Sequence, residues 1–146
     1  MKNIKHVQLI NQTLTYEKDK WLKELAIIND KINRKISNIE RIRHYQDEYN
    51  DDKKLQISRI VPALHKNLTN FSQRIDEIIR DEEAKLEKLT RDRDMMEEKI
   101  ELMRQKIKLM EKFAVTIETE QRIQLDKREQ SSLDDLASNK FTRGSR

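Results

Sequence analysis

The chain has 146 residues with one Gly, one Pro and no Cys, and 40% of its residues are Asp, Glu, Lys or Arg. Two turn-forming residues exclude all-β sandwiches and doubly wound α/β domains, which need a turn about every 8–15 residues, and the lack of Cys excludes disulfides and thiolate metal sites. A net charge of only +4 with 35% regularly spaced hydrophobic residues favours long helices that share a thin apolar seam over disorder.

The first predicted element is a helix over residues 1–54. Apolar residues recur along it at steps of three and four, which is the spacing of one helix face. Two consecutive steps of four, from Ile28 to Ile32 to Ile36, predict a stutter that locally unwinds a supercoil. The stripe then continues to Tyr49.

A turn is predicted at residues 55–62, because Pro62 is tolerated in the first turn of a helix but not in its interior. A second helix is predicted over residues 63–130, where apolar steps of three and four alternate along most of the segment. Two steps of four between Ile78 and Leu86 predict a second stutter.

The two stutters face each other if the chain reverses near residue 58, since the numbers of facing residues then add up to about 116. We therefore predict an all-α fold, a long two-helix antiparallel coiled-coil hairpin with arms of about 70–80 Å. The same register places Trp21 opposite Met95 and Met96. One domain is expected overall.

The arms are unequal, so residues beyond about 118 are expected to form a C-terminal helical overhang. Ser131-Ser132 followed by Asp134-Asp135 resembles the start of a helix, which predicts a short last helix and a frayed tail over residues 131–146. An overhanging helix either binds a partner or frays, and the sequence leaves both open.

No pattern of catalytic or metal-binding residues accompanies these helices. A single Gly near the C-terminus excludes the glycine-containing nucleotide and nucleophile motifs. His6, His44 and His65 lie far apart and lack a zinc-binding motif. Residues 80–111 mix nine Lys/Arg with ten Asp/Glu, which is typical of a solvated helix face and not of a nucleic-acid interface. We expect no enzyme, no cofactor, no metal and no nucleic-acid partner.

Two stretches of the sequence are distinctive. The first is Tyr45-Gln46-Asp47-Glu48-Tyr49 with Phe71 in the early second helix, and the second is residues 127–137, which contain Glu129, Gln130, Asp134 and Asp135. Both stretches resemble the flagellar export protein FliJ family. The resemblance implies a stalk-like, non-enzymatic component of the bacterial flagellar type III export apparatus. The partners it implies are the hexameric export ATPase FliI, its regulator FliH, the export gate FlhA and export chaperones. It also implies a cytoplasmic location, peripheral on the inner membrane through these partners only.

The resemblance implies positions for two of these contacts. The surface for the export gate is expected at Asn38, Ile42, Tyr45, Tyr49, Phe71, Ile75 and Ile78. The ATPase-facing end is expected at Ile4, Val7, Leu14, Met103, Ile107, Met110 and Ile117. The aromatic residues also fit the seam, so core and docking roles are both open for them. Two other functions remain open as well, an injectisome type III secretion stalk and a generic homodimeric coiled-coil tether or scaffold.

Overall fold

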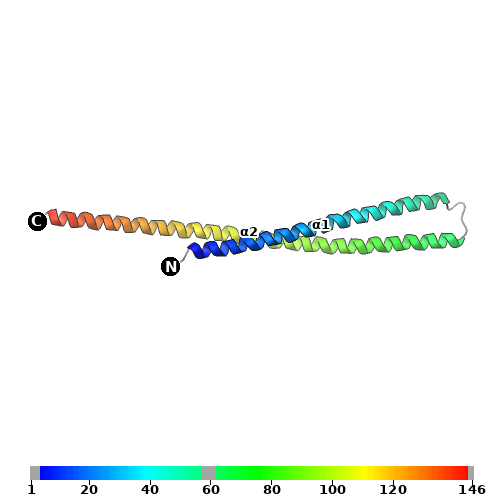
Figure 1. Cartoon of the computed structure of the whole chain (residues 1–146), viewed down its shortest axis with the longest axis horizontal. Helices are drawn as coiled ribbons and strands as arrows, with labels where there is room; N and C mark the ends of the chain where they lie inside the picture. Colours follow the sequence, from blue (N-terminus) through cyan, green and yellow to red (C-terminus); the bar gives the residue numbers. More distant parts are fainter. Residues whose placement is uncertain (1–3, 57–61, 145–146) are drawn as a thin grey trace. The chain divides into compact units, whose positions relative to one another are not determined.

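The computed structural model describes the backbone of residues 4–56 and 62–144 and the side chains of residues 4–51, 66, 67 and 69–141. These residues form two α-helices, α1 (Ile4–Gln56) and α2 (Pro62–Gly144) (Figure 1). The two long helices pack against each other, which confirms the predicted all-α helical hairpin. Residues 57–61, which make up most of the predicted turn, lie outside the described residues.

The chain divides into two compact units. The terminal unit comprises Met1–Asp19 and Glu101–Arg146, and the central unit comprises Lys20–Ile100. Within each unit a stretch of α1 lies beside a stretch of α2 that runs in the opposite direction (Figure 1). Each unit is therefore built from segments that are distant in the sequence.

A regular seam holds the helices together. The buried and half-buried side chains of α1 include, at alternating steps of three and four, Ile4, Val7, Asn11, Leu14, Lys18, Trp21, Leu25, Ile28, Ile32, Lys35, Ile39, Ile42, Gln46 and Tyr49. Those of α2 include, in the same way, Ile75, Ile79, Glu82, Leu86, Leu89, Arg93, Met96, Ile100, Met103, Ile107, Met110, Ala114 and Ile117. This is the heptad pattern of coiled-coil packing, in which every first and fourth position faces the partner helix.

The two predicted stutters are wrong. Ile36 and Ile78 are 39% and 50% exposed, and the seam takes the neighbouring Lys35 and Ile79 instead. The Lys35 Nζ donates a hydrogen bond of 2.6 Å to Glu82 Oε2 across the seam. Because each charge satisfies the other and the lysine stem is itself apolar, the heptad continues through these polar positions without a break.

Lys99 is a neighbour of Trp21 that the predicted register did not name. The Nζ of Lys99 lies 5.6 Å from the centroid of the Trp21 ring, a distance suited to a cation–π contact. Of the two methionines expected opposite this ring, Met95 is 63% exposed and Met96 is half-buried at a seam position.

The C-terminal part of α2 is one uninterrupted helix. The predicted break before a short last helix is wrong, because α2 continues through Ser131 and Ser132 to Gly144. Serine lowers helix stability by only about 0.5 kcal/mol relative to Ala, so two serines without Pro or Gly do not end a helix. The side chains of residues 118–141 are all exposed, and Gln121 and Gln124 occupy the next two seam positions after Ile117.

Candidate functional site

An apolar groove lies between α1 and α2 in the central unit. It has a volume of about 350 Å³ and is lined by Asn38, Arg41, Ile42, Tyr45, Phe71, Ile75 and Ile78. Ile75 is buried and Ile42 is half-buried in the seam, so these two form its deeper part. Tyr45, Phe71 and Ile78 are 64%, 43% and 50% exposed. The structure thus brings together six of the seven residues predicted for the export gate.

Tyr49, the seventh residue of that set, does not line the groove. Its side chain is half-buried at a seam position, and its ring packs edge-to-face against Phe71 with the centroids 4.9 Å apart and the planes at 60°. Edge-to-face packing is a favoured arrangement of two aromatic rings, so Tyr49 holds the Phe71 ring in place. Between Tyr45 and Tyr49, Tyr45 is the exposed one.

The other flank of the seam carries polar contacts between the helices. Arg43 forms an ion pair with Glu83, and the Gln46 Nε2 donates a hydrogen bond to Asp76 Oδ1. The positions that border a heptad seam on its two sides face opposite flanks. Arg43 follows the seam residue Ile42 and lies on one flank, whereas the groove opens on the other. The apolar groove is therefore the uncovered side of this part of the hairpin.

Lys35 and Glu82 form a charge pair within the seam of the central unit. The side chains of Lys35 and Glu82 are only 23% and 18% exposed. The hydrogen bond from Lys35 lowers the pKa of Glu82, and Lys85, whose Nζ is 3.4 Å from Glu82 Oε1, lowers it further. Glu82 is therefore held ionised between two lysines.

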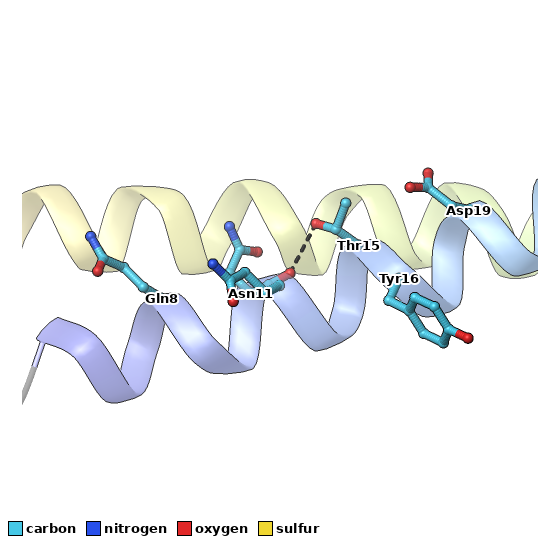
Figure 2. A pocket seen from close by; sticks show the side chains of 6 residues that line it. Gln8, Asn11, Thr15, Tyr16 and Asp19 are labelled. Carbon is cyan, nitrogen blue, oxygen red and sulfur yellow. Dashed lines mark hydrogen bonds between the residues drawn. The ribbon is translucent and has the colours of Figure 1, made fainter.

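A polar groove runs along the first part of α1 in the terminal unit. It is lined by Gln8, Asn11, Gln12, Thr15, Tyr16 and Asp19, several of which Figure 2 shows as sticks. The Thr15 hydroxyl donates a hydrogen bond of 2.9 Å to the main-chain carbonyl oxygen of Asn11 (Figure 2). The Asn11 Oδ1 is buried and has no hydrogen-bond partner among the described residues. This groove was not predicted from the sequence, where its one signal is Asn11, a polar residue at a seam position.

The residues predicted for the ATPase-facing end form the core of the terminal unit. Val7, Met103, Ile107 and Ile117 are 3–8% exposed, and Ile4, Leu14 and Met110 are half-buried. Their side chains hold α1 and α2 together there. This unit exposes a different set of large apolar side chains, which includes Leu9, Tyr16, Leu102 and Leu109.

The predicted C-terminal motif lies on the exposed part of α2. Glu129, Gln130, Asp134 and Asp135 are all exposed. Among the histidines, His6 is exposed and the His44 Nε2 lies 3.2 Å from Glu48 Oε1, whereas the side chain of His65 lies outside the described residues. Over the described part of the chain, no group of three or more His, Asp or Glu side chains is arranged to hold a metal ion.

Comparison with known proteins supplies the family. The family model of the flagellar FliJ protein matches residues 8–146. The chain belongs to the FliJ family. No curated protein and no solved structure matches it.

Membership of the FliJ family makes the chain a component of the flagellar protein export apparatus. The family is a non-catalytic structural and export component, and its members belong to the cytoplasmic export machinery. Within the described ranges, neither α1 nor α2 contains a stretch apolar enough and long enough to cross a membrane.

Proposed function

We propose that the chain is a non-enzymatic, stalk-like rod that couples the export ATPase FliI to the membrane export gate FlhA. The family membership and the helical hairpin support this role, and the apolar groove supports it most specifically. Six residues that the resemblance implies for gate binding line one concave apolar surface. Apolar side chains in a groove are the usual anchor points for a partner helix.

The gate partner would place apolar side chains over Ile42 and Ile75 and against the exposed rings of Tyr45 and Phe71. Exposed aromatic side chains beside a preformed pocket often carry much of the binding energy of an interface. Tyr49 supports this surface indirectly, since its ring packs against Phe71. In this proposal the gate-binding residues are those that line the groove, and Tyr49 is a positioning residue.

In this proposal the terminal unit binds the FliI hexamer and FliH. The predicted residues there are core, so they would keep the end folded while exposed neighbours contact the ATPase. Leu9 and Tyr16 on α1 and Leu102 and Leu109 on α2 are 53–74% exposed and offer such contacts. Escort of export chaperones, and an association with the membrane that depends on these partners, complete the proposed role.

Tyr45→Ala tests the gate contact. We expect binding to the purified cytoplasmic part of FlhA to weaken about tenfold or more, as for an aromatic anchor, with helix content unchanged because Tyr45 is 64% exposed. Tyr16→Ala is the matched control, because Tyr16 is also on α1 and 74% exposed but lies outside the groove. Calorimetric titration of both variants is the measurement, and swarming motility is compared only between Tyr45→Ala and the wild type, because Tyr16 is itself a proposed ATPase contact. Equal gate affinity of Tyr45→Ala and Tyr16→Ala would remove the groove from the proposal.

The match to a flagellar family favours this proposal over an injectisome stalk. The packing of α1 on α2 within one chain favours it over a homodimeric tether, whose seams would each need a second molecule. Pull-down of the flagellar ATPase by the purified protein, with no retention of the injectisome ATPase, tests the first choice. Retention of the injectisome ATPase alone would reverse it.

A further inference from the structure

A second groove adjoins the apolar one in the central unit. It has a volume of about 470 Å³ and is lined by Lys31, Arg34, Lys35, Asn38, Lys85, Lys88, Leu89 and Asp92. Five of these residues are cationic and one is acidic, so we call it the basic groove. Asn38 lines both grooves, which makes them neighbours on one surface.

The heptad spacing places the two grooves on the same flank of the seam. On α1, Lys31, Asn38 and Tyr45 are seven residues apart, and on α2 the same spacing joins Phe71, Ile78, Lys85 and Asp92. Residues seven apart on a coiled-coil helix share one face. Along this flank the surface therefore changes from aromatic and aliphatic at Tyr45 and Phe71 to cationic at Lys31 and Lys85, over about 21 Å of helix.

Part of the positive charge of the basic groove is already neutralised. Arg34 Nε lies 3.1 Å from Asp30 Oδ2, and Lys35 and Lys85 share Glu82. Lys31 and Lys88 have no acidic partner among the residues that the structure describes, and both are exposed. These two ammonium groups, one from each helix, are the charges that the groove offers to a ligand.

The lining favours a polypeptide over a small anion or a phosphate backbone. Leu89 is half-buried at the seam, and lysine stems are apolar along most of their length, so the groove has an apolar base below its charged rim. Asp92 also lines it, which disfavours a polyanion. A segment with both carboxylates and apolar side chains matches such a surface, because potentials across specific interfaces are complementary.

We infer that one acidic segment of the partner spans both grooves, with its apolar side chains in the apolar groove and its carboxylates beside Lys31 and Lys88. About four turns of helix, or some 14 residues, cover the distance. This inference rests on the proposed function, because it describes the part of the gate partner that binds Tyr45 and Phe71. It adds the chemistry of that part, an amphipathic stretch that is acidic at one end.

The test compares salt-dependent binding of three proteins to the purified cytoplasmic part of FlhA. The variant is Lys31→Gln with Lys88→Gln, and the control is Lys108→Gln with Lys112→Gln, which removes two exposed lysines of α2 outside the groove. At about 50 mM NaCl we expect the variant to bind about three- to tenfold more weakly than the wild type, mainly through a slower on-rate. At about 500 mM NaCl the difference should vanish, since exposed charges are then screened. The control should follow the wild type at both concentrations.

Tyr45→Ala in the same series separates this inference from the proposed function. If it weakens binding at both salt concentrations while the lysine variant binds as the wild type does, the inference is wrong and the gate contact stands. If neither variant changes binding, the proposed gate contact fails too. A loss in the lysine variant that is equal at low and high salt would also overturn the inference. Wild-type retention on phosphatidylglycerol vesicles or duplex DNA that the lysine variant loses would assign the groove to a phosphate-bearing ligand instead.

Discussion

Glu82→Gln removes one partner of the only charge pair that joins two seam positions among the described residues. The variant leaves the Lys35 ammonium at a site where its side chain is only 23% exposed, without the carboxylate 2.6 Å away. Breaking a fully buried pair costs about 3–5 kcal/mol, whereas exposed pairs contribute about 0.2–1 kcal/mol. For this intermediate exposure we expect the free energy of unfolding to fall by about 1–2 kcal/mol.

The assay is urea unfolding followed by circular dichroism, with Glu77→Gln as the control. Glu77 is an exposed glutamate of α2, so the control makes the same change in charge outside the seam. The double variant Lys35→Leu with Glu82→Leu should be at least as stable as the wild type, because it replaces both charges by seam-compatible apolar side chains. A loss below about 0.3 kcal/mol for Glu82→Gln, similar to that of Glu77→Gln, would show that water screens the pair.

The same pair predicts how stability depends on pH. The pKa of Glu82 is lowered in the folded state by the hydrogen bond from Lys35, relative to an ordinary value of 4.5. A carboxylate with a lowered folded pKa stabilises the fold fully above its unfolded pKa and loses this contribution as the pH falls through the folded pKa. The stability difference between wild type and Glu82→Gln should therefore be constant above about pH 5 and shrink below pH 4.5. A difference that stays constant down to pH 3 would contradict this assignment.

Two further substitutions test the seam. Ile79→Ala should lower the free energy of unfolding by about 2–4 kcal/mol, because Ile79 is only 8% exposed. Ile78→Ala should lower it by less than about 1 kcal/mol, because Ile78 is 50% exposed. Equal losses of the two variants in urea unfolding would restore the predicted stutter. Asn11→Leu should raise the free energy of unfolding by about 1–2 kcal/mol, because it removes a buried oxygen without a partner. A lower melting temperature for Asn11→Leu would instead indicate that Asn11 is satisfied by water.

The hairpin could be predicted from the sequence because its seam repeats over many turns, and period and length are the most reliable sequence signals. Which residues face the partner helix in the middle of the hairpin could not be predicted in the same way. A pattern that counts only apolar residues moves from Lys35 to Ile36, and it cannot choose between the adjacent Ile78 and Ile79, which are both apolar. Charged side chains at seam positions become acceptable only when the opposite helix supplies a partner, and that partner is known only once the two helices are paired.

The candidate site, too, could be predicted from the sequence only in part. The apolar groove could be predicted from the residues of the family resemblance, and the structure shows which of them are accessible, as the contrast between Tyr45 and Tyr49 illustrates. The basic groove was missed because charges of both signs alternate along residues 80–111. Its cations gather only when Lys31 from α1 lies beside Lys88 from α2.

In the structure both grooves form where α1 and α2 of one chain pack against each other. Carbodiimide forms an amide bond between an amine and a carboxylate that are in contact, so it should join Lys35 to Glu82, whose Nζ and Oε2 are 2.6 Å apart. The reaction is carried out on a mixture of unlabelled and ¹⁵N-labelled protein and analysed by mass spectrometry. Cross-linked peptide pairs that are entirely light or entirely heavy are the expected result. Mixed light–heavy pairs in statistical proportion would show that the seam forms between two molecules.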